Sequence, residues 1–395
     1  MTHSGIPRYR FTLSSWLRTA VHGWFQTSHR RYSNAGPLSQ ALSTSRIPGL
    51  DFLRALAVFA VLVDHSGAFT GQGPRLLNSA TGVQMFFVLS GFLITWMLLD
   101  ETQRQGHINL RAFYLRRFAR LMPVFYAYVL IGTIMLLLAH KLVPWGALAA
   151  SLVYGLNYYQ GLNGAPTHFL SHCWSLAVEE QFYFIWPLTL AFMLRARMQL
   201  AKSIVLVLLC VWVYRAAAQL MGLASDEYLY RALEMRADHL LIGCLLAVLL
   251  KQAQVRSWFE RTHAAYPWLL LVLFAILSIS GSYDGNLNYR YSVGYVIEPI
   301  ATTLLLPLLV ISAQNKRSPF AWFVNSPLIV KVGQASYGIY LFHQLLLYSM
   351  ETRLAAWMHS PLIGFLIAAM LLSVLAHLSY TYFEMPIRRR LHPRA

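Results

Sequence analysis

Four ionisable side chains lie within one apolar stretch, residues 49–69, which is long enough to cross a bilayer as a helix. They are Asp51, Arg54, Asp64 and His65. Placing Arg or Asp inside a membrane costs about 2.5–3.5 kcal/mol on insertion scales, so such groups face a bundle interior, a partner or a water-filled path. This stretch is therefore the first candidate for acid–base or binding chemistry.

The spacing of these residues indicates a shared helix face. Arg54 and His65 are separated by eleven positions, about 1100° of helical turn, so they point within about 20° of each other and lie ~16 Å apart along the axis. Asp51 lies on the same stripe, whereas Asp64 is rotated about 100° from His65. The alternative is a snorkelling arginine and a histidine bonded to a neighbouring helix. We favour the functional interpretation because the two groups share a face.

Two further motifs could bind or react. In FFVLSG, Ser90 is a conceivable nucleophile, but without a GxSxG elbow we interpret Ser90-Gly91 as a site of close helix packing. Arg116, Arg117 and Arg120 follow in FYLRRFARLMP. Arg117 and Arg120 fall on one helical face and could bind phosphates, or they could form a basic collar at the membrane surface. Both interpretations stay open.

A pair of glutamates, Glu179 and Glu180, lies in HCWSLAVEEQFYFIWPL, about 10 Å from the start of its predicted helix. One of them is expected to face the bundle, where it could orient the His65 imidazole or stabilise its cation. The alternative is a structural salt bridge to Arg236 or Arg215.

Polar residues also occur in the later spans. Asp238 and His239 lie at the outer end of one of them, and Ser336, Tyr337, Tyr340 and His343 follow one another along KVGQASYGIYLFHQLLL. A lone histidine such as His343, expected near mid-membrane, is more often a satisfied bundle residue than a catalyst. Glu384 is expected to form a salt bridge at the inner end of the last span.

The composition requires a membrane protein. Of the 395 residues 57% are hydrophobic and only 12% charged, against about 25% charged in soluble domains. We predict an all-α bundle with apolar spans at 49–69, 81–99, 121–140, 173–194, 203–220, 236–250, 267–281, 291–312, 332–350 and 361–383. Cys173, Cys210 and Cys244 show no metal-site or disulfide spacing, and no metal is expected.

The distribution of basic residues predicts the topology. With both termini in the cytoplasm and 142–172 outside as a re-entrant or interfacial segment, the inner segments carry 24 Lys and Arg residues and the outer ones 6. Treating 142–158 as an eleventh span would invert every later segment. The net charge of +17 therefore reflects membrane topology, and no nucleic-acid partner is expected. His65 and the two glutamates then lie at similar depths near the outer side.

These motifs, in this order, resemble those of acyltransferase family 3, integral membrane enzymes that O-acylate cell-surface and secreted carbohydrates. The resemblance covers Arg54-x10-His65, FFVLSG, Arg117-x-x-Arg120, WSLAVEEQFY, SYGIYLFH and YFEMPIRR. It implies a transmembrane acyltransferase domain at 47–390, between a basic and largely disordered cytoplasmic tail at 1–46 and a short basic C-terminus at 391–395. It also implies residence in a bacterial inner membrane and an expected lack of the family's extra hydrolase-like domain.

The resemblance implies acetyl-CoA or another acyl-CoA as cytoplasmic donor and an extracytoplasmic glycan as acceptor. Residues Arg54, Arg116, Arg117 and Arg120 are then expected to bind the donor. His65, with Glu179 and Glu180, is expected to be catalytic, as a general base or as a covalent acyl carrier. The acceptor is expected to contact Trp174, Ser175, Asp238 and His343. The alternative is a transporter or flippase that uses the same buried groups as a relay, although no clear internal repeat occurs.

Overall fold

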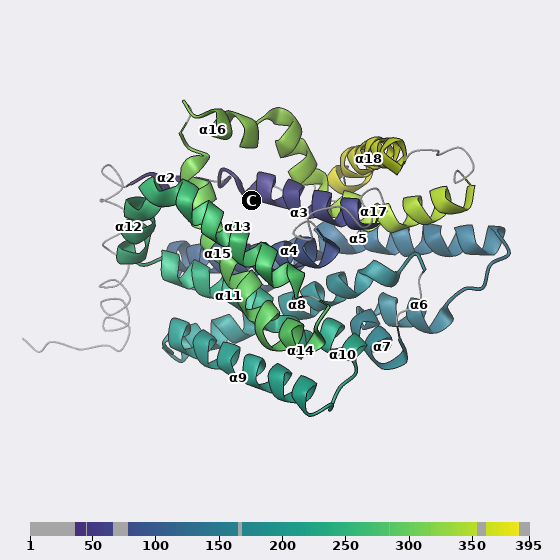
Figure 1. Cartoon of the computed structure of the whole chain (residues 1–395), viewed down its shortest axis with the longest axis horizontal. Coiled ribbons are helices and arrows are strands. Elements are labelled where there is room, and N and C mark those ends of the chain that lie inside the picture. The colour runs from purple at the N-terminus through teal and green to yellow at the C-terminus, as the bar shows by residue number, and fades with distance from the viewer. Residues whose placement is uncertain are drawn as a thin grey trace, which may run out of the picture.

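The computed structural model describes residues 36–44, 46–65, 78–164, 168–283, 285–315, 317–353 and 361–386. Every element in these ranges is a helix (Figure 1), which confirms the predicted fold class. Five segments are long and apolar enough to cross a membrane, namely Ser79–Gln105, Leu110–Leu138, Leu200–Leu220, Leu287–Ser312 and Phe365–Tyr382. The protein is therefore a membrane protein.

All ten predicted spans fall on helices, although the number of crossings and the side of the termini stay predictions. The helices are α3 (Leu50–His65), α4 (Ser79–Gln105), α5 (Leu110–Leu138), α8 (Trp174–Arg195), α9 (Leu200–Leu220), α11 (Leu233–Leu250), α13 (Tyr266–Ser282), η4 (Arg290–Gly294) with α15 (Tyr295–Ser312), α17 (Pro327–Arg353), and α18 (Pro361–Leu378) with η5 (Ser379–Glu384). The shorter elements are α10 (Asp226–Arg231), α12 (Ala253–Thr262), η3 (His263–Ala265), α14 (Leu287–Tyr289) and α16 (Pro319–Val324).

The ambiguous segment 142–158 forms two short helices, α6 (Trp145–Leu152) and α7 (Leu156–Asn163), of 8 residues each. Between them Tyr154 adopts a positive φ of 52°, a conformation that ends a right-handed helix. A helix of this length spans only about 12 Å, so neither can cross the hydrocarbon core alone. This agrees with the prediction that the segment is not a single transmembrane helix.

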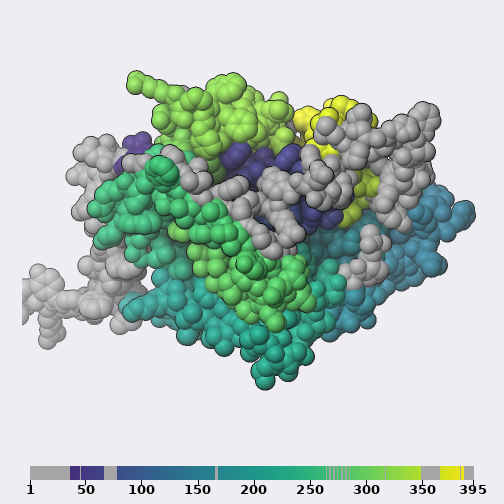
Figure 2. Space-filling view, viewed as in Figure 1, coloured from purple at the N-terminus to yellow at the C-terminus, as the bar shows by residue number. Residues whose placement is uncertain are grey.

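Helix α3 lies between α4 and α17, and close backbone contacts hold this central group together. A Cβ atom at Gly333 of α17 would lie 2.0 Å from the Asp51 carbonyl oxygen of α3. A Cβ atom at Gly91 of α4 would lie 1.9 Å from the Leu240 carbonyl oxygen of α11. Only glycine permits such an approach, so the predicted packing role of Gly91 is confirmed. Figure 2 shows part of α3, in purple, reaching the surface on one side of the bundle.

The predicted N-terminal tail is partly structured. Residues 1–35 lie outside the described residues, but α2 (Pro37–Leu42) follows directly and packs into a hydrophobic cluster beside α12 and α15. Leu38 is 0% exposed, and its backbone N–H donates a 3.0 Å hydrogen bond to Glu260 Oε1. The prediction of a largely disordered tail at 1–46 stays a prediction, while residues Pro37–Leu42 form a helix whose apolar face is buried by helices distant in sequence.

The central helices have two chemically different ends. At the end that we call the histidine end, the N–H of Ser79 at the start of α4 donates to Asp64 Oδ2 near the end of α3 at 3.0 Å, beside His65. At the opposite end, which we call the basic end, α4 finishes near Arg104 and α5 begins a short distance before Arg116. Helices α3 and α4 therefore run in opposite directions between the two ends.

Candidate active site

A cavity of about 1730 Å³ enters the bundle from the basic end. Its lining follows α4 from Gln105 back to Val83, about 33 Å at 1.5 Å per residue. This length is close to the ~30 Å thickness of a bilayer's hydrocarbon core. The cavity therefore extends over nearly the full depth of the membrane-spanning bundle.

The wide basic end of the cavity is built to attract anions. The basic residues that line it are Arg46, Arg54, Arg104, Arg116, Arg117, Arg120, Lys251 and Arg256. Several are held by carboxylates: Arg54 Nη1 lies 2.9 Å from Asp51 Oδ1, and Arg104 Nη2 lies 2.7 Å from Asp100 Oδ2. The four arginines predicted to bind the donor are all in this lining, and the predicted common stripe of Asp51 and Arg54 is confirmed by their contact.

Arg117 projects from α5 toward α8. Its guanidinium carbon lies 3.6 Å from the centre of the Tyr183 ring, and its Nε atom has no hydrogen-bond partner among the described residues. A guanidinium stacked on an aromatic ring keeps its planar N–H groups available for oxyanions. The stacking therefore positions Arg117 without using up its hydrogen-bonding capacity.

Lys251 is a cavity residue that sequence reasoning missed. It directly follows α11, and its Nζ atom lies 3.8 Å above the Trp96 ring of α4 and donates a 3.2 Å hydrogen bond to Gln103 Oε1. Burial lowers the pKa of Lys251 to about 8, and nearby Asp100 opposes that shift. No sequence signal distinguishes this lysine from other basic residues at helix ends.

Ser90 and Glu179 meet on the wall of the cavity. The Ser90 hydroxyl donates a 2.6 Å hydrogen bond to Glu179 Oε1. Glu179 is thus bonded to α4, and the expectation that it orients His65 finds no support in its contacts. Glu180 is not part of the cavity lining. The alternative of a glutamate–Arg215 salt bridge is wrong, because Arg215 pairs with Asp238.

The far end of the cavity is closed by hydroxyl groups. The Ser175 and Tyr340 hydroxyl oxygens are 2.6 Å apart, and both residues line the cavity together with Ser336 and Tyr337. Trp174 does not line the cavity but packs against Phe87 and Tyr230, with ring centroids 6.3 and 4.9 Å away.

Three histidines follow one another beyond Tyr340. The ring centroids of His65 and His343 are 5.0 Å apart, and those of His343 and His172 are 4.7 Å apart. His343 therefore lies beside His65 at the histidine end, while its depth in the membrane stays a prediction. His172, in η2 (Ser171–Cys173) just before α8, was not singled out from the sequence. The Tyr340 ring centroid is 5.4 Å from both His172 and His343.

Hydrogen bonds to carbonyl groups define which nitrogens carry protons. Because a carbonyl oxygen only accepts, His65 Nδ1–H donates to Val61 O at 2.9 Å and His343 Nδ1–H donates to Tyr340 O. Both neutral rings then present a free lone pair on Nε2. His343 is 0% exposed, and its Nε2 has no hydrogen-bond partner among the described residues. The expectation of a satisfied bundle histidine is therefore wrong.

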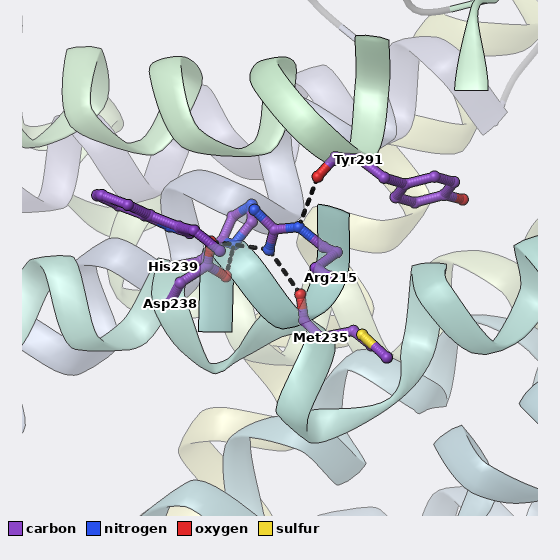
Figure 3. Close-up of polar contacts among 6 residues, drawn as sticks. Arg215, Met235, Asp238, His239 and Tyr291 are labelled. Atoms are coloured by element: carbon purple, nitrogen blue, oxygen red, sulfur yellow. Dashed lines mark hydrogen bonds and ion pairs between the residues drawn. The ribbon is translucent and has the colours of Figure 1, made fainter. Parts of the chain in front are cut away.

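Asp238 belongs to a separate polar network away from the cavity. Figure 3 shows Arg215 donating to the carbonyl oxygens of Tyr291 and Met235, at 2.8 and 2.7 Å, and to Asp238 Oδ2 at 2.8 Å. His239 Nδ1 lies 2.7 Å from Asp238 Oδ1. The side chains of Arg215, Asp238 and His239 are all fully buried. The network joins α9, α11 and η4, and nothing in its contacts supports the predicted role of Asp238 in acceptor binding.

The last predicted polar contact concerns Glu384, which is buried in η5 and accepts a 3.5 Å hydrogen bond from the Ser379 hydroxyl. The arginine run at 388–390 that could pair with it lies outside the described residues.

A family model and two relatives that match this chain are all described as acyltransferases. A family model described as an acyltransferase domain matches residues 47–378. O-acetyltransferase OatA of Staphylococcus aureus is 28% identical over 371 residues, covering 89% of this chain and 59% of the relative. The putative peptidoglycan O-acetyltransferase YrhL of Bacillus subtilis is 29% identical over 386 residues, covering 92% of this chain and 56% of the relative. The chain thus spans somewhat more than half the length of these relatives. No solved structure matches.

Proposed function

Because the chain belongs to the acyltransferase 3 family, we propose that it is an O-acyltransferase that uses acyl-CoA and modifies an extracytoplasmic glycan. The donor is acetyl-CoA or a related acyl-CoA, and the acceptor is a hydroxyl of a surface polysaccharide or of peptidoglycan. The relatives named as O-acetyltransferases support the acetyl group and the O-linkage.

The cavity is the observation that carries this proposal. Eight cationic side chains line it and outnumber the carboxylates there, such as Asp51, Asp100 and Glu101, which pair with some of them. Arginine binds phosphates through charge-assisted, bidentate hydrogen bonds. The cavity's long, partly apolar course along α4 suits the extended pantetheine arm. The thioester would then lie near Ser175 and Tyr340, at the opposite end from the phosphates.

The distribution of basic residues assigns the two ends to the two sides of the membrane. The basic end is cytoplasmic, in agreement with the excess of Lys and Arg in the predicted inner segments. The histidine end then faces outward in a multi-pass protein of a bacterial inner membrane. With this orientation, the donor enters from the cytoplasm and the acceptor approaches His65 from outside.

His65 is the proposed reactive group. The hydrogen bond from Nδ1–H to Val61 fixes the tautomer that leaves Nε2 free, as required of a general base or of a nucleophile that carries the acyl group. His65 is exposed but does not line the cavity. Tyr340 lies between the two, so we expect its side chain to move when the donor binds.

The test is acyl transfer by the protein purified into lipid nanodiscs, with acetyl-CoA as donor and chitotetraose as a model glycan. Wild-type protein should acetylate the glycan and release CoA. His65→Ala should bind acetyl-CoA with unchanged affinity and transfer nothing, because the phosphates bind at the opposite end of the cavity. His140→Ala, on an exposed loop, is the matched control. A wild-type protein that does not bind acetyl-CoA, or a His65→Ala variant with normal transfer, would overturn the proposal.

A further inference from the structure

In acyl transfer across the bundle, the proton of the acceptor hydroxyl is released at the histidine end, away from the thiolate that must be protonated. In the proposed reaction, a bond forms between the acceptor oxygen and the acyl carbon while the carbon–sulfur bond of the thioester breaks. The electron pair of that bond goes to sulfur, and the hydroxyl proton goes to His65. The departing group is a thiolate. Thiols such as cysteine have an unperturbed pKa of about 8.5, so the thiolate accepts a proton at neutral pH. The proton is released at His65, whereas the thiolate that needs it forms in the cavity, on the other side of the Tyr340 side chain.

The three histidines connect these two points. His65 is exposed at the histidine end, His343 is buried next to it, and His172 follows at a ring-centroid distance of 4.7 Å from His343. Tyr340 contacts both buried rings, and its hydroxyl reaches Ser175 in the cavity lining. In each imidazole one nitrogen is held by a backbone carbonyl oxygen, of Val61, Tyr340 and Leu341 respectively, so the other nitrogen is the one that can accept and release a proton.

We propose that His343, with His172 and Tyr340, relays the proton of the acceptor hydroxyl from His65 to the cavity, where it ends on the sulfur of the departing CoA. This inference rests on the proposed function. The same balance holds if the acyl group is first carried by His65, because the acceptor hydroxyl still loses one proton and the thiolate still gains one. No additional acid, base or redox partner is needed.

The local contacts of His343 distinguish a relay from a packing role. His239, which is equally buried, also has an Nε2 atom without a hydrogen-bond partner among the described residues, so that feature alone does not distinguish His343. What distinguishes His343 is that the rings of His65 and His172 lie on either side of it. Because His343 Nδ1–H is held by the Tyr340 carbonyl oxygen, Nε2 is the atom that would accept the proton and release it.

The first experiment separates turnover from donor binding. His343→Gln keeps a donor for the Tyr340 carbonyl but cannot accept and release a proton as imidazole does. We expect kcat for acetyl transfer to chitotetraose to fall about a hundredfold, the lower end of the range for general acid–base catalysis, with the KM for acetyl-CoA unchanged. His168→Gln is the matched control, since His168 accepts a 3.1 Å hydrogen bond from Leu170 N and its ring pairs with that of Phe169. An unchanged kcat in His343→Gln would overturn the relay.

The second experiment needs no variant. Protein in sealed proteoliposomes receives acetyl-CoA on one side and chitotetraose, with a pH-sensitive dye, on the other. Because neither substrate crosses a bilayer, only one orientation is active. A relay predicts that acetylation releases no proton into the glycan compartment, whereas discharge of His65 into water releases one proton per acetyl group. Release of one proton would overturn the relay, while a lack of any acetyl transfer by the wild type would instead contradict the proposed function.

Discussion

The hydroxyl of Ser90 donates a 2.6 Å hydrogen bond to the carboxylate of Glu179, across a sequence separation of 89 residues. This contact joins α4 to α8 about one third of the way along the cavity from its far end, between Tyr340 and the basic end. Ser90 therefore has a polar partner in addition to the glycine packing beside it, and Glu179 is committed to that partner rather than to His65.

Removing the Ser90 hydroxyl should destabilise the bundle. Ser90→Ala leaves a half-buried carboxylate oxygen without its donor, which costs about 1 kcal/mol. A double-mutant cycle with Glu179→Gln, followed by thermal denaturation in nanodiscs, should show a coupling of about 0.5–3 kcal/mol. Additive effects of the two substitutions would contradict a direct contact.

Replacing Arg117 and Arg120 with Ala should weaken acetyl-CoA binding much more than folding. Each lost charge-assisted contact with a phosphate is worth about 1.5–3 kcal/mol. Isothermal titration calorimetry measures the loss, with Arg195→Ala, outside the cavity lining, as control. Unchanged binding combined with a collapse of expression would show that the pair is only a basic collar.

Donor binding should weaken as the pH rises through about 8. The pKa of Lys251 is lowered to about 8, chiefly by burial, so its ammonium is present below that pH and lost above it. We expect the Kd for acetyl-CoA to rise several-fold between pH 7 and pH 9. Lys251→Arg should flatten this dependence, because arginine stays charged. If the Kd of Lys251→Met for acetyl-CoA depended on pH as strongly as that of the wild type, Lys251 would be excluded as the origin of the dependence.

Breaking the Arg215–Asp238 pair should affect stability rather than chemistry. Both side chains are fully buried, and removing one partner of such a pair typically costs about 3–5 kcal/mol. Asp238→Asn should therefore lower the thermal midpoint, while the folded fraction keeps its kcat and its KM for the glycan. A raised KM for chitotetraose at normal stability would restore the predicted acceptor role of Asp238.

The topology is testable with reporter insertions. A reporter after Gly106, where α4 ends, and one after Ala395 should both report the cytoplasm. A reporter after Gly164, whose Cβ position is open, should report the outer side. A cytoplasmic signal at Gly164 would restore an eleventh span and invert the predicted side of every later segment.

Composition and local pattern were sufficient to predict the helices. Ten apolar stretches predicted ten helices because a lipid environment requires backbone hydrogen bonds to be made within each segment. Helical periodicity likewise predicted the common stripe of Asp51 and Arg54, since residues three apart share a face. Charge and spacing singled out Arg117 and Arg120, and both line the cavity together with Arg54 and Arg116; their binding of the donor stays a prediction.

The partners across helices were decided only by tertiary structure. These helices are apolar on most sides, so hydrophobicity does not show which face meets which neighbour. Sequence depth alone placed Glu179 near His65, but rotation about the α8 axis directs Glu179 to Ser90. The same reason hid His172 and Lys251, whose contacts with His343 and Trp96 depend on how distant helices pack. Local sequence determines where a helix forms, whereas the side chains that meet in the site depend on contacts between residues far apart in the chain.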